Sequence, residues 1–283
     1  MALETRAYAK INLGLAVLRR REDGYHDIET VFHRINLFDR LTFELADAIS
    51  VKSSSDEIPP EKGNLCFEAA TLLREHCGLA RGVAITLEKC IPVGAGLGGG
   101  SSDAASTLLA LRDLWSIRID DVALSVLALR LGSDVPYFLK DGSALAHGRG
   151  EVLEHFSLRL PYAILVCNPG IHVATKWAYG KVVPHADQQR PAFKDLILSN
   201  LESPERLSGL LTNDFEPPVF QEFPVIGNLK QRLLQEGASL ALMSGSGSTV
   251  FGLFRKEETA AALGERLSKN GYVVSLTAPM FTL

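Results

Sequence analysis

A glycine-rich stretch between a predicted strand and a predicted helix constrains this chain more than any other feature. It runs from residue 92 to 105, with the sequence PVGAGLGGGSSDAA, and the alternating segment 82–89 before it predicts a half-buried strand. Apolar residues at helical spacing follow it (Ala104, Ala105, Leu108, Leu109, Leu111, Leu114 and Trp115). Glycine lets the backbone approach a ligand closely, and a helix start offers N–H groups and partial positive charge. We therefore expect a cradle for an anion, above all a phosphate.

This stretch partly resembles two nucleotide-binding patterns. Gly94, Gly96 and Gly99 satisfy the G-x-G-x-x-G pattern of dinucleotide-binding folds, but segment 121–130 predicts a helix where that fold needs a second parallel strand. The P-loop pattern fails because Gly100 stands where lysine is required. An NAD-dependent oxidoreductase therefore remains only an alternative, as does a turn that serves packing alone.

Composition and charge narrow the class of protein. The chain has 283 residues, 46% hydrophobic and 22% charged, and its net charge of −4 gives no electrostatic reason to expect nucleic acid. No apolar run approaches the ~18 residues of a membrane span. Arg6 and Lys10 interrupt the first apolar segment, which argues against a secretory signal. The four cysteines are widely spaced, which favours free thiols in a reducing compartment. We predict a cytoplasmic enzyme.

Several polar residues of the first half stand in unusual places. Lys10 lies inside the apolar strand predicted for 5–18, where its ammonium either reaches water or faces a phosphate or a reacting hydroxyl. Tyr25 and His26 follow an Asp-Gly turn. They are either part of an ordinary surface loop or the residues that bind a nucleobase. Asp134 follows a predicted helix. It is either an ordinary turn residue or a functional carboxylate.

The elements predicted for the first half are strands at 27–35 and 41–45, a loop at 52–61, and a helix at 64–77 capped by Asn64. The pattern restarts near 157–161. The second half predicts strands at 162–167, 238–243, 249–254 and 272–276, helices at 175–182, 193–198, 205–211, 225–236 and 257–268, and a Ser-Gly loop at 244–248. The strand–helix–strand–strand–helix–strand order is that of a ferredoxin-like domain.

Five motifs in order along residues 5–275 give the chain a family resemblance. They are AYAKINL at 7–13, DGYH at 23–26, the glycine-rich stretch, LGSDVP at 131–136 and SGSG at 244–247. In this combination the chain resembles the GHMP kinase superfamily. The resemblance implies an α+β fold with an N-terminal domain at 1–158, which contains a left-handed βαβ unit, and a ferredoxin-like C-terminal domain at 159–283. The cleft between the domains is where the superfamily binds ATP and substrate.

The resemblance also implies an activity. AKIN, DGYH and GSDVP are similar to the branch of the superfamily that serves the non-mevalonate route to isoprenoids. That branch uses ATP and Mg²⁺ to phosphorylate the 2-hydroxyl of a small substrate carrying a cytidine diphosphate group. Homoserine kinase or mevalonate kinase is the alternative within the superfamily, and a non-catalytic nucleotide-binding module is a further one. Monomer and homodimer both remain open.

By the same resemblance Lys10 and Asp134 form the catalytic pair. The residues implied for the nucleotide are Pro92, Gly94, Ala95, Gly96, Leu97, Gly98, Gly99, Gly100, Ser101 and Ser102, with Asn64 and Lys89 on the adenosine side. Mg²⁺ is expected to be held mainly by ATP oxygens and water, with Ser102 as a candidate ligand.

The residues implied for the substrate are Asn12, Tyr25, His26, Phe32, Thr175, Tyr179, Gly245 and Ser246. His26 is expected to hydrogen-bond the cytosine base. Trp177 competes with Tyr179 as the second aromatic ring that stacks on it.

Overall fold

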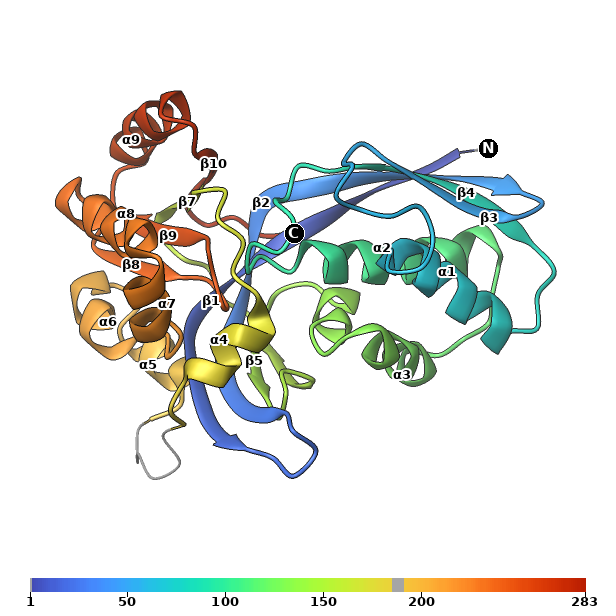
Figure 1. Ribbon diagram of the computed structural model, residues 1–283, viewed down its shortest axis with the longest axis horizontal. Coiled ribbons are helices and arrows are strands. Elements are labelled where there is room, and N and C mark those ends of the chain that lie inside the picture. The colour runs from blue at the N-terminus through green and yellow to red at the C-terminus, as the bar shows by residue number, and fades with distance from the viewer. Residues whose placement is uncertain (1, 185–190) are drawn as a thin grey trace. The chain divides into compact units, whose positions relative to one another are not determined.

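The computed structural model describes residues 2–184 and 191–283 (Figure 1). Packing divides the chain into two compact units. The first unit comprises the chain up to Ala9, with Phe38–Val93 and Gly98–Asp141. The second comprises Lys10–Leu37, Gly94–Leu97 and Gly142–Leu283. Two long strands, β1 (Ala2–Arg20) and β2 (His26–Ala46), therefore contribute to both units. The boundary near residue 158 stays a prediction.

The first unit is built on strands that lie side by side. The far end of β2 (residues 40–46) pairs antiparallel with β4 (Gly82–Glu88), and β3 (Ile49–Ser53) pairs parallel with β4. With α1 (Leu65–His76) between β3 and β4, this is a βαβ unit. β3 was missed because it is short. Moreover, β2 is one strand and not the two predicted, because residues 36–40 between them also remain extended.

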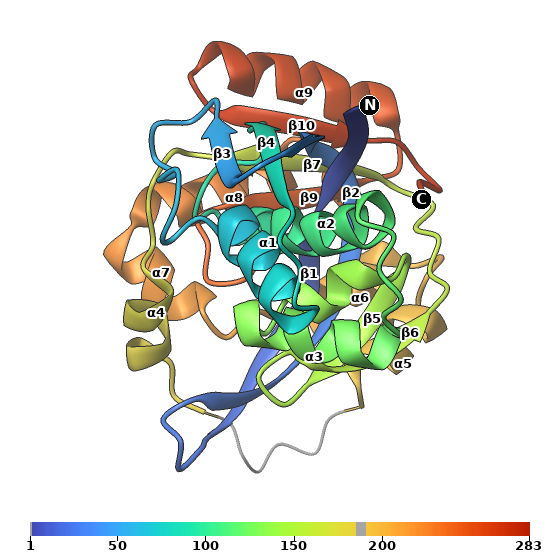
Figure 2. The same ribbon diagram turned by 90° about the vertical axis from the view of Figure 1, so that its right-hand side faces the viewer.

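Helices cover one face of these strands, as Figures 1 and 2 both show. Asn64 caps α1 as predicted, its side-chain oxygen accepting from the N–H groups of Cys66 and Phe67. α2 (Gly99–Leu114) packs against α1, and α3 (Asp121–Leu131) packs against both. The short 3₁₀ helix η1 (Val135–Leu139) follows. Because α3 succeeds α2 without an intervening strand, the dinucleotide-binding alternative loses the strand it requires.

The second unit holds the ferredoxin-like arrangement predicted from element order. Its antiparallel sheet has the order β10-β7-β9-β8. The strands are β7 (Ala163–Asn168), β8 (Leu240–Met243), β9 (Val250–Phe254) and β10 (Val273–Thr277). α8 (Pro224–Gln235) packs on β8 and β9, and α9 (Glu257–Lys269) packs on β7 and β10. Buried side chains such as Leu165, Leu233 and Leu263 fill the layer between helices and sheet.

The remaining elements of the second unit are short. The start of β2 (residues 30–32) pairs with β5 (Ser143–His147), which pairs with β6 (Val152–Phe156). The others are α4 (Thr175–Lys181), α5 (Phe193–Ser199), α6 (Pro204–Leu210) and α7 (Glu216–Glu222). α7 was not predicted, because two prolines interrupt its helical pattern near the N-terminus, where proline is tolerated. Among the described residues, no helix combines the length and apolar character that crossing a membrane requires.

Candidate active site

The glycine-rich stretch ends in the first turn of α2, within the first unit. Gly98 precedes the helix with a φ of +70°, a conformation that glycine adopts without strain, and its carbonyl accepts from Ser102 N–H at 2.9 Å. The N–H groups of Gly99, Gly100 and Ser101 thus have no carbonyl partner within the helix. A Cβ on Gly99 would lie 2.9 Å from Ile91 Cγ2, so a side chain there would have to displace Ile91. This backbone fits the predicted anion cradle.

The two serines of the stretch differ in availability. Ser102 is buried, and its hydroxyl donates to the carbonyl of Tyr8 at 2.8 Å. Ser101 is half-buried at the first turn. Ser102 therefore serves the packing of α2, and the roles of Ser101 and Ser102 as ligands of phosphate or Mg²⁺ stay predictions.

A buried polar cluster surrounds Lys10 in the second unit. The Lys10 side-chain ammonium (Nζ) donates to Asn12 Oδ1 at 2.7 Å and to the Gly96 carbonyl at 3.3 Å, and it lies 5.0 Å from the centre of the Phe32 ring. Lys10 and Asn12 are 4% and 2% exposed. Lys10 thus does not extend to water, which was the non-functional alternative for this residue.

Two residues that the sequence did not single out complete this cluster. Thr30 accepts from Asn12 Nδ2 at 2.9 Å and donates to the Gly14 carbonyl at 2.6 Å. Ser244 accepts from the Asn12 N–H at 3.2 Å and donates to the Gly96 carbonyl at 2.9 Å. Ser244 belongs to the SGSG motif, which could have identified it, whereas nothing near Thr30 in the sequence distinguishes it.

The Ser-Gly loop packs tightly against the glycine-rich stretch. A Cβ on Gly96 would lie 2.1 Å from the Ser244 carbonyl, and a Cβ on Gly245 would lie 3.3 Å from Gly96 Cα. Asn213, also missed, donates from Nδ2 to the carbonyls of Met243 and Gly245 and holds this loop. The hydroxyls of Thr175 and Ser246 lie 3.1 Å apart, so these two predicted substrate residues are brought together.

The aromatic residues predicted for the cytosine base also cluster. The ring of His26 stacks on that of Tyr179 at 5.0 Å between centroids, and Tyr179 in turn packs edge-on against Phe215. Trp177 packs edge-on against Phe223, and both Trp177 and Tyr179 pack against the core of the second unit, so the choice between them as the stacking residue stays a prediction. Partial burial, followed by the charge of Arg20, lowers the pKa of His26, so its ring stays neutral at neutral pH.

Tyr25 remains accessible beside this group. Its side chain is 54% exposed, and the guanidinium of Arg149 lies 4.6 Å from the centre of its ring. One of its faces is thereby covered by a cation.

Other predicted residues have clear placements of their own. Asp134 is half-buried in the first unit, directly before η1, and its pairing with Lys10 stays a prediction. Asn64 uses its side chain to cap α1 and to donate to the Pro59 carbonyl, and the Lys89 ammonium contacts two buried carboxylates. These contacts of Asn64 and Lys89 do not by themselves indicate a bound nucleotide, so the adenosine role of both residues also stays a prediction.

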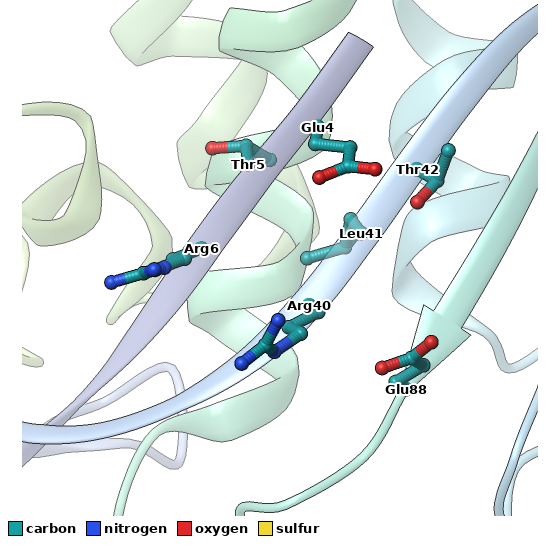
Figure 3. A pocket seen from close by; sticks show the side chains of 7 residues that line it. All are labelled: Glu4, Thr5, Arg6, Arg40, Leu41, Thr42 and Glu88. Carbon is teal, nitrogen blue, oxygen red and sulfur yellow. The ribbon is translucent and has the colours of Figure 1, made fainter. Parts of the chain in front are cut away.

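The first unit also carries a shallow polar pocket of ~290 Å³ (Figure 3). Charged and polar side chains of β1, β2 and β4 line it together with Leu41 (Glu4, Thr5, Arg6, Arg40, Thr42 and Glu88). None of the predicted site residues is among them. Within the described residues no group of three or more His, Cys, Asp or Glu side chains could hold a metal. The expectation that Mg²⁺ is held mainly by ATP oxygens and water stays a prediction.

Family comparisons agree with this geometry. The family described as GHMP kinases N terminal domain matches residues 64–142, and the one described as GHMP kinases C terminal matches residues 192–273. A curated relative from Chlorobium phaeobacteroides (strain BS1), named 4-diphosphocytidyl-2-C-methyl-D-erythritol kinase, is 46% identical over 99% of each chain. A relative of the same name from Chlorobium limicola is 44% identical over 100% of this chain and 99% of its own.

Solved structures extend the likeness to the fold. A crystal structure of 4-(cytidine 5'-diphospho)-2C-methyl-D-erythritol kinase matches with a TM-score of 0.83 and 39% identity, covering 97% of this chain and 98% of that one. Homoserine kinase from Cytophaga hutchinsonii matches with a TM-score of 0.72 at 17% identity, over 98% of this chain and 95% of its own. The second likeness concerns the fold alone.

Proposed function

The chain belongs to the GHMP kinase family, and from this premise we propose that it transfers the γ-phosphate of ATP to the 2-hydroxyl of 4-diphosphocytidyl-2-C-methyl-D-erythritol. The observation that carries the proposal is the 46% identity, over 99% of each chain, to a relative of that name. The low-identity likeness to homoserine kinase supports no second candidate. The enzyme works in the cytoplasm on a small-molecule substrate.

The phosphates of ATP bind at the start of α2. N–H groups without helical partners and the positive end of the helix dipole favour an anion there, and glycines let it approach the backbone. When bound, Mg²⁺ would neutralise charge on the transferring phosphoryl group, and Ser101, half-buried in the first turn of α2, is the hydroxyl that we assign to it.

Lys10 and Asp134 serve the reacting hydroxyl. An ordinary aspartate, with a pKa of about 3.9, is a poor base towards an alcohol, so early deprotonation is implausible. In a loose phosphoryl-transfer transition state the proton leaves late. Asp134 therefore orients the substrate hydroxyl and accepts its proton as the new P–O bond forms. The bond between the γ-phosphorus and the bridging oxygen breaks, and ADP leaves. The Lys10 ammonium offsets negative charge near the transferring phosphoryl group.

The cytidine end is bound by the aromatic group of the second unit. Neutral His26 has one donor and one acceptor nitrogen for the edge of the base, and Tyr179 and Tyr25 offer ring faces. Thr175 and Ser246 offer adjacent hydroxyls for polar groups of the substrate.

The test is ADP formation with Mg-ATP and three acceptors, namely 4-diphosphocytidyl-2-C-methyl-D-erythritol, mevalonate and homoserine. We expect turnover with the first acceptor, at a kcat/KM at least about a hundredfold above the other two, because the base-binding group has nothing to contact in either of them. Preference for mevalonate or homoserine would refute the proposal.

A further inference from the structure

A buried charge cluster lies beneath the start of α2 in the first unit, and the proposed mechanism gives it no task. It consists of Asp39 on β2, Lys89 directly after β4 and Asp103 in the second turn of α2, whose side chains are 0%, 6% and 3% exposed. Lys89 Nζ donates to Asp39 Oδ2 and, at 2.8 Å, to Asp103 Oδ2. Charges buried this deeply are costly unless each is paired, so the cluster has a demanding geometry.

Asp39 holds the residues that lead into the glycine-rich stretch. Its Oδ1 accepts from the N–H groups of Cys90 at 2.6 Å and Ile91 at 2.8 Å. Hydrogen bonds from N–H groups to a carboxylate are stronger than those between neutral groups. The backbone just before Pro92 is thereby attached to a rigid strand.

Lys89 holds the residues that follow the stretch. Its ammonium binds Asp103 on α2, and it stands 3.3 Å from the position that a Cβ of Gly99 would occupy. The cation therefore lies against the first helical turn, whose N–H groups we assign to the phosphates. Through Lys89 both ends of the stretch are tied to the same carboxylate, that of Asp39.

We propose that Asp39, Lys89 and Asp103 are positioning residues of the kinase, which fix the two ends of the glycine-rich stretch together and so aim the N–H groups of α2 at the phosphates of ATP. The inference rests on the proposed function, because it takes ATP as the ligand of this helix start. It gives Lys89 a task that needs no direct contact with the nucleotide.

The first test is Asp39→Asn, which keeps the shape of the side chain. If the one amide oxygen accepts from the two N–H groups, the amide NH2 group faces Lys89 and cannot accept from its ammonium. We expect the KM for ATP to rise about tenfold, with the KM for the cytidine substrate changed less than about twofold. A merely structural role would lower the folded fraction, and so the apparent kcat, without moving either KM. Unchanged KM values would overturn the proposal.

The matched control is Arg81→Met. Arg81 donates from Nη1 to the Trp115 carbonyl at 3.0 Å, so it ties β4 to α2 at the opposite ends of both elements. We expect this variant to lose thermal stability while its KM for ATP stays within about twofold of the wild type. If Arg81→Met lost as much ATP affinity as Asp39→Asn, the proposal would also be contradicted. Any contact that joins β4 to α2 would then affect ATP binding to the same extent.

The second test separates positioning from direct contact between Lys89 and ATP. Lys89→Met leaves two buried carboxylates facing each other, and we expect the KM for ATP to rise about tenfold or more. Adding Asp103→Asn removes that repulsion and is expected to restore the KM to within about threefold of the wild type. If Lys89 contacted the nucleotide itself, the second substitution could restore nothing.

Direct binding of a non-hydrolysable ATP analogue, measured by calorimetry, keeps this inference distinct from the proposed function. If the wild type binds the analogue but does not phosphorylate the cytidine substrate, the proposed function fails while the variants still report on positioning. Affinities for the analogue that stay equal to the wild type in both Asp39→Asn and Lys89→Met refute the positioning role whatever the acceptor is.

Discussion

Two buried lysines of this kinase lie in different units and contact different groups. In the second unit, Lys10 donates to the amide oxygen of Asn12 and the carbonyl of Gly96 over the face of Phe32. In the first unit, Lys89 lies between the carboxylates of Asp39 and Asp103. Two carboxylates that accept from one ammonium offset its charge locally. The comparison teaches that burial alone does not mark a catalytic lysine, since the side chain of Lys89 is buried like that of Lys10 and yet joins parts of the fold.

The largest expected effect comes from removing the ammonium that we assign to the reacting groups. Lys10→Met should lower kcat about a thousandfold, with the KM for ATP changed less than about threefold, because the ammonium acts on the transferring phosphoryl group. Steady-state kinetics beside Lys89→Met, for which we expect the reverse pattern, is the measurement. If both variants changed the same parameter, the distinction between the two lysines would be lost.

A smaller effect is expected from disturbing the neutral oxygens around Lys10. Gly96 has a φ of +79°, and a Cβ there would lie 2.1 Å from the Ser244 carbonyl, so Gly96→Ala should cost about 3 kcal/mol of stability and lower kcat. Gly271→Ala is the control, since Gly271 has a φ of +86° and nothing within 4 Å of its Cβ position. Thermal unfolding should show a loss of only about 1 kcal/mol for it. Equal losses of stability in the two variants would mean that the effect of Gly96→Ala comes from the positive φ alone and not from the contact with Ser244.

The smallest expected effect is a pH dependence confined to the Lys89 cluster. Burial raises the pKa of Asp103 to about 7, with Lys89 opposing the shift and Asp39 adding to it. Below that pH the cluster is neutral, and above it a net negative charge lies beneath the phosphate site. The KM for ATP should therefore rise about two- to threefold between pH 6 and pH 8.

Asp103→Asn is the control for this pH dependence, because ATP itself titrates in the same range. The wild type should show a steeper rise of KM than the variant, and parallel pH profiles would exclude a role for Asp103. The free energy of unfolding should also become less favourable to the folded state as the pH rises. The contribution of Asp103 to the free energy of unfolding is fully present below its ordinary pKa of 3.8 and is lost as the pH rises through about 7.

The sequence predicted those features of the fold that are determined by residues close together in the chain. The capping of α1 by Asn64, the helix after the glycines and the ferredoxin-like order all follow from local periodicity and turn chemistry. The Lys89 cluster could not be predicted, because Lys89 and Asp39 are 50 residues apart and neither lies in a pattern that names the other. Thr30 was missed for the same reason, since its value lies in contacts with Asn12 and Gly14. Motif resemblance identified residues of the site and implied one pair, Lys10 and Asp134, but not the contacts that Thr30 and Lys89 make.

The most direct test of the catalytic assignment is a double-mutant cycle on kcat with Lys10→Met and Asp134→Ala. Both groups are assigned to the same reacting hydroxyl and phosphoryl group, so we predict that the double variant is about as slow as the slower single variant. If the two losses multiply, Lys10 and Asp134 act independently and the assignment is contradicted.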